Sequence, residues 1–138
     1  MKTAVAGAGG GGVEVRVRYP EVDRMGVVHH TVHLIWFEIG RTELMRSRGL
    51  PYATLEDDGL FLPVIEAACT YRAPARYDDV LTVSTEVTES GPVRVSFSYR
   101  VERAADRCLI ATGMTRHAAV SRNGRPRRLP AGIRERLA

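Results

Sequence analysis

The longest helical pattern in this chain runs from residue 32 to about residue 48. Its apolar positions recur at mostly helical spacing, and two further apolar residues widen the stripe: Val32, Ile35, Trp36, Ile39, Leu44 and Met45, with Leu34 and Phe37 beside them. Gly49 and Pro51 follow, and both residue types end helices. A helix that is apolar around most of its circumference has to be buried by the structure around it. We therefore predict one long central helix.

Five other stretches have the composition or the alternation of β-strands, in which successive side chains face opposite sides of a sheet. They are residues 13–19, 60–71, 80–88, 93–101 and 108–120, and short helical turns are expected at 52–58 and 133–137. The connections between the strands are too short for parallel crossovers, which predicts antiparallel neighbours. The predicted fold class is therefore α+β, with an antiparallel five-stranded sheet wrapped around one long central helix.

The chain has 138 residues, which is enough for one domain with a substantial core and too few for two. Residues 1–12 are mostly glycine and alanine, and we predict a disordered leader there, followed by a single domain over residues 13–138. The glycines do not make a phosphate-binding loop, because no strand precedes them and no Gly-Lys-Ser/Thr follows.

Composition bears on the compartment and on the kind of partner. No apolar run approaches the roughly 20 residues of a membrane helix, and no secretory signal is recognised. Cys69 and Cys108 lie in apolar stretches, where reduced core thiols are expected, and this predicts a cytoplasmic protein. The net charge is +4, and residues 116–138 contain seven arginines but only one glutamate. This basic part predicts either a polyanionic partner, such as a nucleic acid or a phosphate-rich small molecule, or a solvated terminal face.

Residues 19–41 combine the parts of a catalytic site. A carboxylate, Asp23, and a turn glycine, Gly26, come directly before the predicted helix. The first amides of a helix have no partner within it and carry partial positive charge, so they can polarise a carbonyl oxygen. From the residues alone, Asp23 could equally cap a turn or the helix itself.

Two motifs connect this chemistry with a known family. The pattern Tyr-x-x-x-Asp-x-x-Gly-Val-Val-x-His at residues 19–30, followed by Trp-Phe-Glu-x-x-Arg at 36–41, resembles the hotdog-fold acyl-CoA thioesterases of the 4-hydroxybenzoyl-CoA thioesterase type, in particular the Tol-Pal-associated ones. Residues 71–81 resemble the next strand and turn of that family. The resemblance covers roughly residues 13–120 and implies the hotdog fold and hydrolysis of an acyl-CoA thioester. The sequence departs from the family at His33, where a tyrosine is usual, and at Met25, where a small residue is common.

The resemblance also implies the site residues. Asp23 would act as general base or as nucleophile, His30 would orient water or the thiolate leaving group, and Tyr19 would help to hold Asp23 or the substrate. The amides of residues 28–30 would face the thioester oxygen. The residues expected to bind substrate are Gly26, Val28, His33, Arg72, Arg76 and Arg116. Arginines suit the phosphates of coenzyme A, and no cofactor is expected, because a thioester carbonyl is already electrophilic.

Other interpretations have less support from the sequence. His29 and His33 are four residues apart, as in zinc-binding helices, but the chain offers little else for a metal. A hydratase of the same fold would want a histidine where Val28 stands. A nucleic-acid-binding module would place aromatic residues among the C-terminal arginines, and none lies between Arg116 and Arg136. A non-catalytic acyl-CoA-binding or acyl-carrier-binding hotdog protein remains the alternative.

Taken together, these patterns predict a cytoplasmic thioesterase for small or medium acyl-CoAs, with no membrane span and no nucleic-acid partner. An exposed sheet edge and a helix that is apolar nearly all round both need to be covered. We therefore expect a homo-oligomer, either a dimer or a tetramer.

Overall fold

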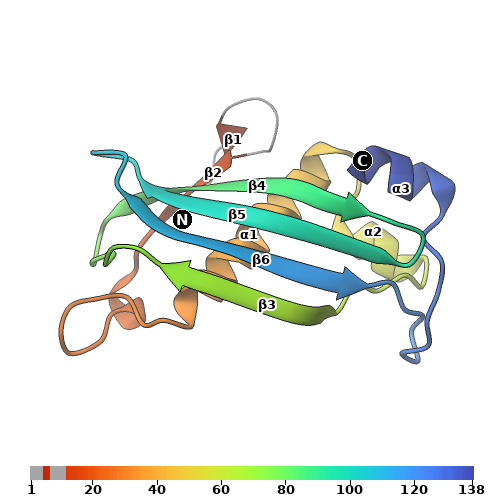
Figure 1. Cartoon of the computed structure of the whole chain (residues 1–138), viewed down its shortest axis with the longest axis horizontal. Coiled ribbons are helices and arrows are strands. Elements are labelled where there is room, and N and C mark those ends of the chain that lie inside the picture. The colour runs from red at the N-terminus through yellow and green to blue at the C-terminus, as the bar shows by residue number, and fades with distance from the viewer. Residues whose placement is uncertain (1–4, 7–11) are drawn as a thin grey trace.

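The computed structural model describes residues 5–6 and 12–138 of the chain (Figure 1). The elements, in chain order, are β1 (Val5–Ala6), β2 (Gly12–Arg16), the short 3₁₀ helix η1 (Tyr19–Glu21), α1 (Val32–Ser47), α2 (Tyr52–Asp57), β3 (Val64–Tyr71), β4 (Val80–Ser90), β5 (Arg94–Arg103), β6 (Leu109–Ala118) and α3 (Ala131–Leu137). Among the described helices, none combines the length and the apolar character needed to cross a membrane.

The strands form one antiparallel sheet with the order β1-β2-β4-β5-β6-β3. Figure 1 shows α1 lying against one face of this sheet, behind the strands in that view. The predicted fold class is therefore confirmed: five longer strands curl over one central helix. The short β1 adds a sixth strand at the β2 edge.

The strand neighbours differ from the prediction in one respect. β3 and β4 follow one another in the chain but do not pair, because β3 lies at the far edge beside β6. Residues 72–79 carry the chain across the end of the sheet. Backbone bonds hold this crossing segment: the Val28 amide donates to the Ala75 carbonyl and the Val17 amide to the Asp79 carbonyl, each over 2.9 Å. Because these backbone groups are paired within the crossing segment, the chain can pass from β3 to β4 without a hairpin between them.

The predicted leader at residues 1–12 lies largely outside the described residues. Within it, Val5–Ala6 form β1, which pairs with Gly12 and Val13 of β2. The sheet therefore begins before residue 13, where the domain was expected to start.

The face of α1 toward the sheet is closely packed. Trp36 and Phe37 are fully buried, and the Phe37 ring stacks on Tyr99 with 4.4 Å between ring centroids and 8° between planes. Two glycines allow this approach: a Cβ on Gly40 would lie 2.9 Å from a methyl group of Val83, and a Cβ on Gly113 would lie within the Phe37 ring. Both close approaches require glycine, because any side chain would push α1 away from the sheet.

The opposite flank of α1 is open, although the sequence pattern predicted a helix buried nearly all round. Leu34 and Ile35 are 41% and 52% exposed. They lie next to β3, whose residues are exposed apart from the half-buried Cys69. One edge of the sheet and one flank of the helix thus form a continuous apolar surface.

The C-terminal arginines hold the tail in place. Several guanidinium groups donate to backbone carbonyls near the ends of α1, α2 and β4, as the following pairs show: Arg122 to Glu56, Arg127 to Asp58, Arg134 to Ser90 and Arg136 to Gly49. Carbonyls at helix C-termini lack partners within the helix, and cationic side chains stabilise them. Four of the seven arginines in the basic tail therefore have an internal structural role.

Candidate active site

Asp23 occupies a tight turn between η1 and α1. Its Oδ1 accepts hydrogen bonds from the amides of Met25 and Val27, over 2.8 and 3.3 Å. Gly26 has a φ of +79° and closes the turn by donating its amide to the Asp23 carbonyl. The side chain is exposed, and Oδ2 has no hydrogen bond to any described residue. The turn therefore orients the carboxylate through one oxygen and leaves the other for chemistry.

Two tyrosines stand beside this turn. Tyr19 and Tyr77 form an edge-to-face pair with centroids 5.7 Å apart, and both line an open hollow together with Asp23 and Gly26. Tyr19 is 76% exposed and makes no hydrogen bond to Asp23 in the described structure. Its expected role in holding Asp23 has no support from a contact, whereas it does form part of the wall.

The amide of His30 lies at the entrance to α1. The sequence predicted that the amides of residues 28–30 would all face a substrate, and for two of them this is wrong. Val28 donates to the Ala75 carbonyl and His29 to the Glu21 carbonyl, both over 2.9 Å. The His30 N–H makes no such bond to any described residue. It is therefore the one amide among residues 28–30 that is available to polarise a substrate carbonyl.

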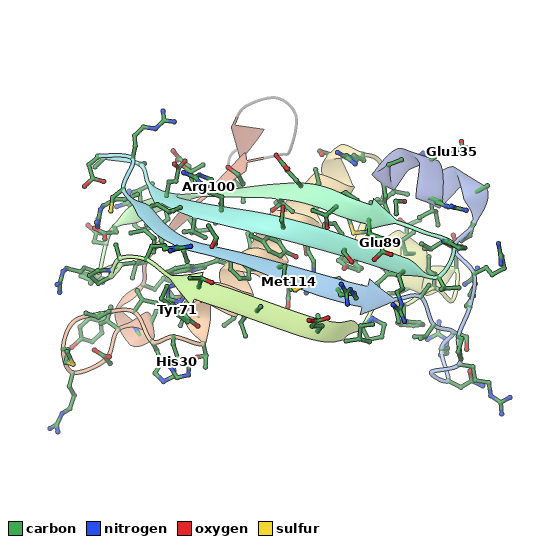
Figure 2. All side chains as sticks on the ribbon, viewed as in Figure 1. His30, Tyr71, Glu89, Arg100, Met114 and Glu135 are labelled. Carbon is green, nitrogen blue, oxygen red and sulfur yellow. The ribbon has the colours of Figure 1, made fainter. Side chains whose placement is uncertain are left out.

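The backbone at His30 is fixed from two sides. Its carbonyl accepts the hydroxyl of Tyr71, at the end of β3, over 2.7 Å, and the Nδ1 of His33, on the first turn of α1, over 3.1 Å. The His33 ring packs edge-on against Tyr71, with centroids 4.8 Å apart. Burial lowers the pKa of His33, so this ring is neutral near pH 7 and donates from Nδ1. Figure 2 shows His30 and Tyr71 together at one end of the molecule.

A second hollow, of about 380 Å³, opens in front of His30. Its walls come from the turn, from α1 and from the segment after β3: Val27, Val28, His30, His33, Tyr71, Arg72, Ala73, Pro74 and Ala75. It adjoins the Asp23 hollow at two consecutive residues, Gly26 and Val27. The Asp23 carboxylate and the His30 amide therefore belong to two neighbouring hollows of a single chain.

The predicted arginines divide into two groups. Arg72 and Arg76 are exposed beside the site. The backbone of Arg76 forms an isolated antiparallel β-bridge with that of Val27. Arg116 does not join them. Its neighbours in β6, Thr115 and His117, are buried on the α1 side, so strand alternation turns Arg116 to the other face, where it pairs with Glu66 over 2.8 Å. Arg116 is therefore removed from the expected substrate rim.

The histidines do not assemble a metal centre in the described part of the chain. His29 Nδ1 hydrogen-bonds with the Thr31 hydroxyl over 2.8 Å, while His33 Nδ1 is bonded to a carbonyl. No group of three or more candidate ligands gathers among the described residues.

Sequence reasoning missed two features of the α1 surface. Tyr71 belongs to a quoted motif, but nothing in the pattern indicated that its hydroxyl would reach His30. The second is the burial of Arg41: its side chain is only 9% exposed, and its Nη2 pairs with Oε1 of Glu38, three residues earlier on the helix, over 3.9 Å. A signal for Arg41 did exist, since it follows Phe37 by four residues and precedes Leu44 by three, which places a charge on the buried face.

A chain of buried hydrogen bonds lies behind Arg41. His117 donates from Nδ1 to the Leu62 carbonyl over 2.9 Å, so its Nε2 accepts from the Thr115 hydroxyl, which in turn accepts from Tyr99. Burial lowers the pKa of His117 to about 4, and the nearby charge of Arg41 acts in the same direction. His117 is therefore a neutral core histidine.

Comparison with known proteins places this chain among thioesterases. Residues 17–137 match the family described as the Thioesterase-like superfamily. The chain is 30% identical over 119 residues to the acyl-CoA thioester hydrolase YbgC of Escherichia coli, covering 86% of this chain and 89% of that protein. It is also 39% identical over 90 residues to the acyl-CoA thioesterase YbgC of Haemophilus influenzae, covering 64% and 66%.

Solved structures agree with these matches. A hypothetical protein from Thermus thermophilus superposes with a TM-score of 0.86 at 40% identity, covering 91% of this chain and 95% of that one. A DHNA-CoA thioesterase from Staphylococcus aureus superposes with a TM-score of 0.82 at 28% identity, covering 86% and 79%. The family match, over residues 17–137, includes both the turn that carries Asp23 and α1.

Proposed function

The chain belongs to the Thioesterase-like superfamily, and from this premise we propose that it hydrolyses acyl-CoA thioesters, with Asp23 as the reacting carboxylate and the His30 amide as the oxyanion donor. Membership of the family confirms the predicted enzyme class, a thioester hydrolase. The single observation that carries the proposal is the turn at residues 23–30, which orients a carboxylate through one oxygen and leaves the His30 N–H unpaired.

The reaction follows from these two groups. Asp23 Oδ2 takes a proton from water as the oxygen of that water bonds to the thioester carbon, and the negative charge that develops on the carbonyl oxygen is stabilised by the His30 N–H. The C–S bond then breaks and the sulfur leaves as thiolate, taking up a proton to give the thiol and the free acid. If Oδ2 instead attacks the carbon directly, a mixed anhydride forms and water hydrolyses it to the same products.

A homodimer through β3 completes this proposal. The β3 edge has no partner strand among the described residues, and it exposes Val64 and Ile65 by 45% and 51% next to Leu34 and Ile35 of α1. Unpaired edges with apolar surroundings favour strand pairing with a second copy. Antiparallel pairing of β3 with its copy brings the Tyr71 end of one strand beside the Val64 end of the other. The open hollow at His30 would then be closed by the second copy.

We also place this enzyme in the cytoplasm. Cys69 and Cys108 are both free thiols, which suits a reducing compartment. Arg72 and Arg76 beside the site are the groups we assign to the phosphates of coenzyme A, because planar guanidinium groups recognise phosphate oxygens well.

The proposal is tested by following the release of free thiol from a panel of acyl-CoAs. We expect Asp23→Asn to lose at least about a hundredfold in kcat, because it removes proton transfer or the nucleophile, while acyl-CoA binding is retained. Asp57→Asn, which changes an exposed aspartate on α2, is the matched control and should leave kcat unchanged. Full activity of Asp23→Asn would overturn the assigned role. Binding without turnover of any acyl-CoA by the unmodified protein would favour the non-catalytic alternative.

A further inference from the structure

The guanidinium of Arg41 lies where two hollows adjoin on the open flank of α1. One hollow, of about 510 Å³, lies between α1, α2 and residues 61–64; the other, of about 300 Å³, lies between α1 and β3. Glu38 and Val64 line both of them, together with Arg41. A side chain that is nine-tenths buried therefore presents its charged end to two cavities.

Arg41 is only partly paired. Its Nε is buried and has no hydrogen-bond partner among the described residues, while Nη2 lies at the long distance of 3.9 Å from Oε1 of the exposed Glu38. In the same chain, Arg127 and Arg136 each donate to a carbonyl at a helix end. A buried charge whose polar atoms are incompletely paired is unfavourable. An acceptor that meets Arg41 in its cavity would offset this cost.

The polar surroundings of Arg41 suit an oxyanion. Burial alone would lower the pKa of Arg41, but Tyr99 and Tyr52, whose phenol oxygens accept hydrogen bonds from the guanidinium, raise this pKa, so Arg41 stays charged. Burial raises the pKa of Tyr52, which keeps that phenol protonated and able to donate. A carboxylate in this position could accept from both groups.

The walls of the smaller hollow are mainly apolar, with Leu34, Ile35, Val64 and Ala67. The larger hollow has an apolar side, formed by Phe61, Leu62, Pro63 and Val120, and a polar side that includes Glu56 and Arg122. A ligand that fits here has an apolar body and one charged end. Such an amphiphile is the chemistry of a fatty acyl chain that ends in a carboxylate.

The hollows are ordered along the helix from the proposed reaction centre. His33 and Tyr71 line the hollow at His30, Leu34 and Ala67 the next one, and Glu38 and Val64 the last. Arg41 follows His30 by eleven residues, which corresponds to roughly 16 Å along a helix. An extended acyl chain held at His30 can reach Arg41 within one chain, and β3 pairing offers a shorter route from the second copy.

We propose that Arg41 binds a carboxylate at the far end of the acyl group, so that the preferred substrates are acyl-CoAs with an apolar chain and a terminal carboxylate. This inference rests on the function proposed above and specifies its substrate class. Glu38, with its side chain 64% exposed and an oxygen 3.9 Å from Arg41, would compete with the ligand for the guanidinium.

The first test compares matched substrates. We expect kcat/KM to be at least about tenfold higher for dodecanedioyl-CoA than for dodecanoyl-CoA, because only the distal carboxylate can form a charge-assisted hydrogen bond with Arg41. Arg41→Met should bring the ratio close to one, and Arg41→Lys should retain part of it. Arg116→Met, on the opposite sheet face, is the matched control and should keep the ratio.

The second test does not depend on turnover. Octanoate and octanol are titrated into the unmodified protein by calorimetry. Octanoate should bind at least tenfold more tightly, and Arg41→Met should abolish the difference. Glu38→Gln should tighten octanoate binding severalfold, because it removes the competing carboxylate, whereas Glu66→Gln, on the other face, should not. The Glu38→Gln result keeps the proposal testable even if Arg41→Met fails to fold.

The outcomes separate this inference from the proposed function. Hydrolysis of plain acyl-CoAs with no preference that depends on Arg41 would overturn the carboxylate site alone. Octanoate binding that depends on Arg41, without hydrolysis of any acyl-CoA, would overturn the thioesterase proposal and leave the site standing. Equal binding of octanoate and octanol would overturn the carboxylate site, and Arg41 would then have a structural role only.

Discussion

The two flanks of α1 differ in what they do for the protein. The flank toward the sheet carries Trp36, Phe37 and Gly40, which pack without gaps against β4, β5 and β6. The flank beside β3 carries Leu34, Ile35 and Glu38, which remain exposed and border two hollows. One helix therefore both packs into the core and presents residues that are free to meet a ligand or a second copy. Stability and function are divided around its circumference.

The largest expected effect lies on the packed flank. Phe37→Ala removes a buried ring that stacks on Tyr99, and it should lower the free energy of unfolding by about 3–5 kcal/mol. Leu34→Ala, on the open flank, is the comparison and should cost about 1 kcal/mol or less. Denaturant unfolding of both variants measures the difference. Equal losses of unfolding free energy in the two variants would mean that both flanks of α1 contribute equally to stability.

The next effect is a loss of stability at acid pH that comes from the buried His117. The pKa of His117 is about 4 in the folded protein and about 6.5 when unfolded. The unfolded chain therefore binds the proton more readily, and the contribution, about 3 kcal/mol, is fully present above pH 6.5 and is lost as the pH falls towards 4. The free energy of unfolding should decrease as the pH is lowered from 6.5 to 4, and His117→Gln should make this free energy depend less on pH. A slope unchanged by that substitution would assign the acid lability to other groups.

The third effect concerns the open flank and the second copy. Ile65→Glu places a charge on the unpaired β3 edge and should weaken the dimer by more than about 30-fold, or about 2 kcal/mol. Val93→Glu changes an apolar residue of similar exposure near the β4–β5 turn and should not alter assembly. Analytical ultracentrifugation with circular dichroism measures mass and fold together. A dimer that survives Ile65→Glu would exclude the β3 edge as the interface.

The smallest effect lies on the outer face of the sheet. Arg116 and Glu66 form an exposed pair, and such pairs contribute about 0–1 kcal/mol. Arg116→Ala should therefore change both the unfolding free energy and kcat/KM very little. A large loss of activity would return Arg116 to the substrate rim from which its position in β6 removes it.

Periodicity predicted the elements of this fold well. The spacing from Val32 onward located α1, and strand alternation located β4 and β5, because each of these patterns depends on local geometry. The pairing of β3 with β6 was not predicted, since strand order depends on contacts distant in the sequence. The open flank of α1 was also missed, because an apolar pattern indicates that a surface needs cover and not which molecule supplies it.

In the candidate site, too, local features were predicted and features that depend on tertiary contacts were not. The motif at residues 19–30 located Asp23, Gly26 and His30 at the start of α1, where the structure also has them. Which amides remain free could not be predicted, because Val28 and His29 are paired with Ala75 and Glu21 by tertiary contacts. The environment of Arg41 was hidden for a related reason: its burial depends on Tyr52 and Tyr99, which come from α2 and β5.

The hydrogen bond from Tyr71 to the His30 carbonyl has a consequence for how the protein behaves on dilution. Tyr71 ends the strand along which two copies are proposed to join, and its hydroxyl braces the turn that presents the His30 amide. If two copies join along β3 as proposed, a subunit that loses its neighbour would also lose support for its own oxyanion donor. Specific activity would then depend on protein concentration and fall as the enzyme is diluted.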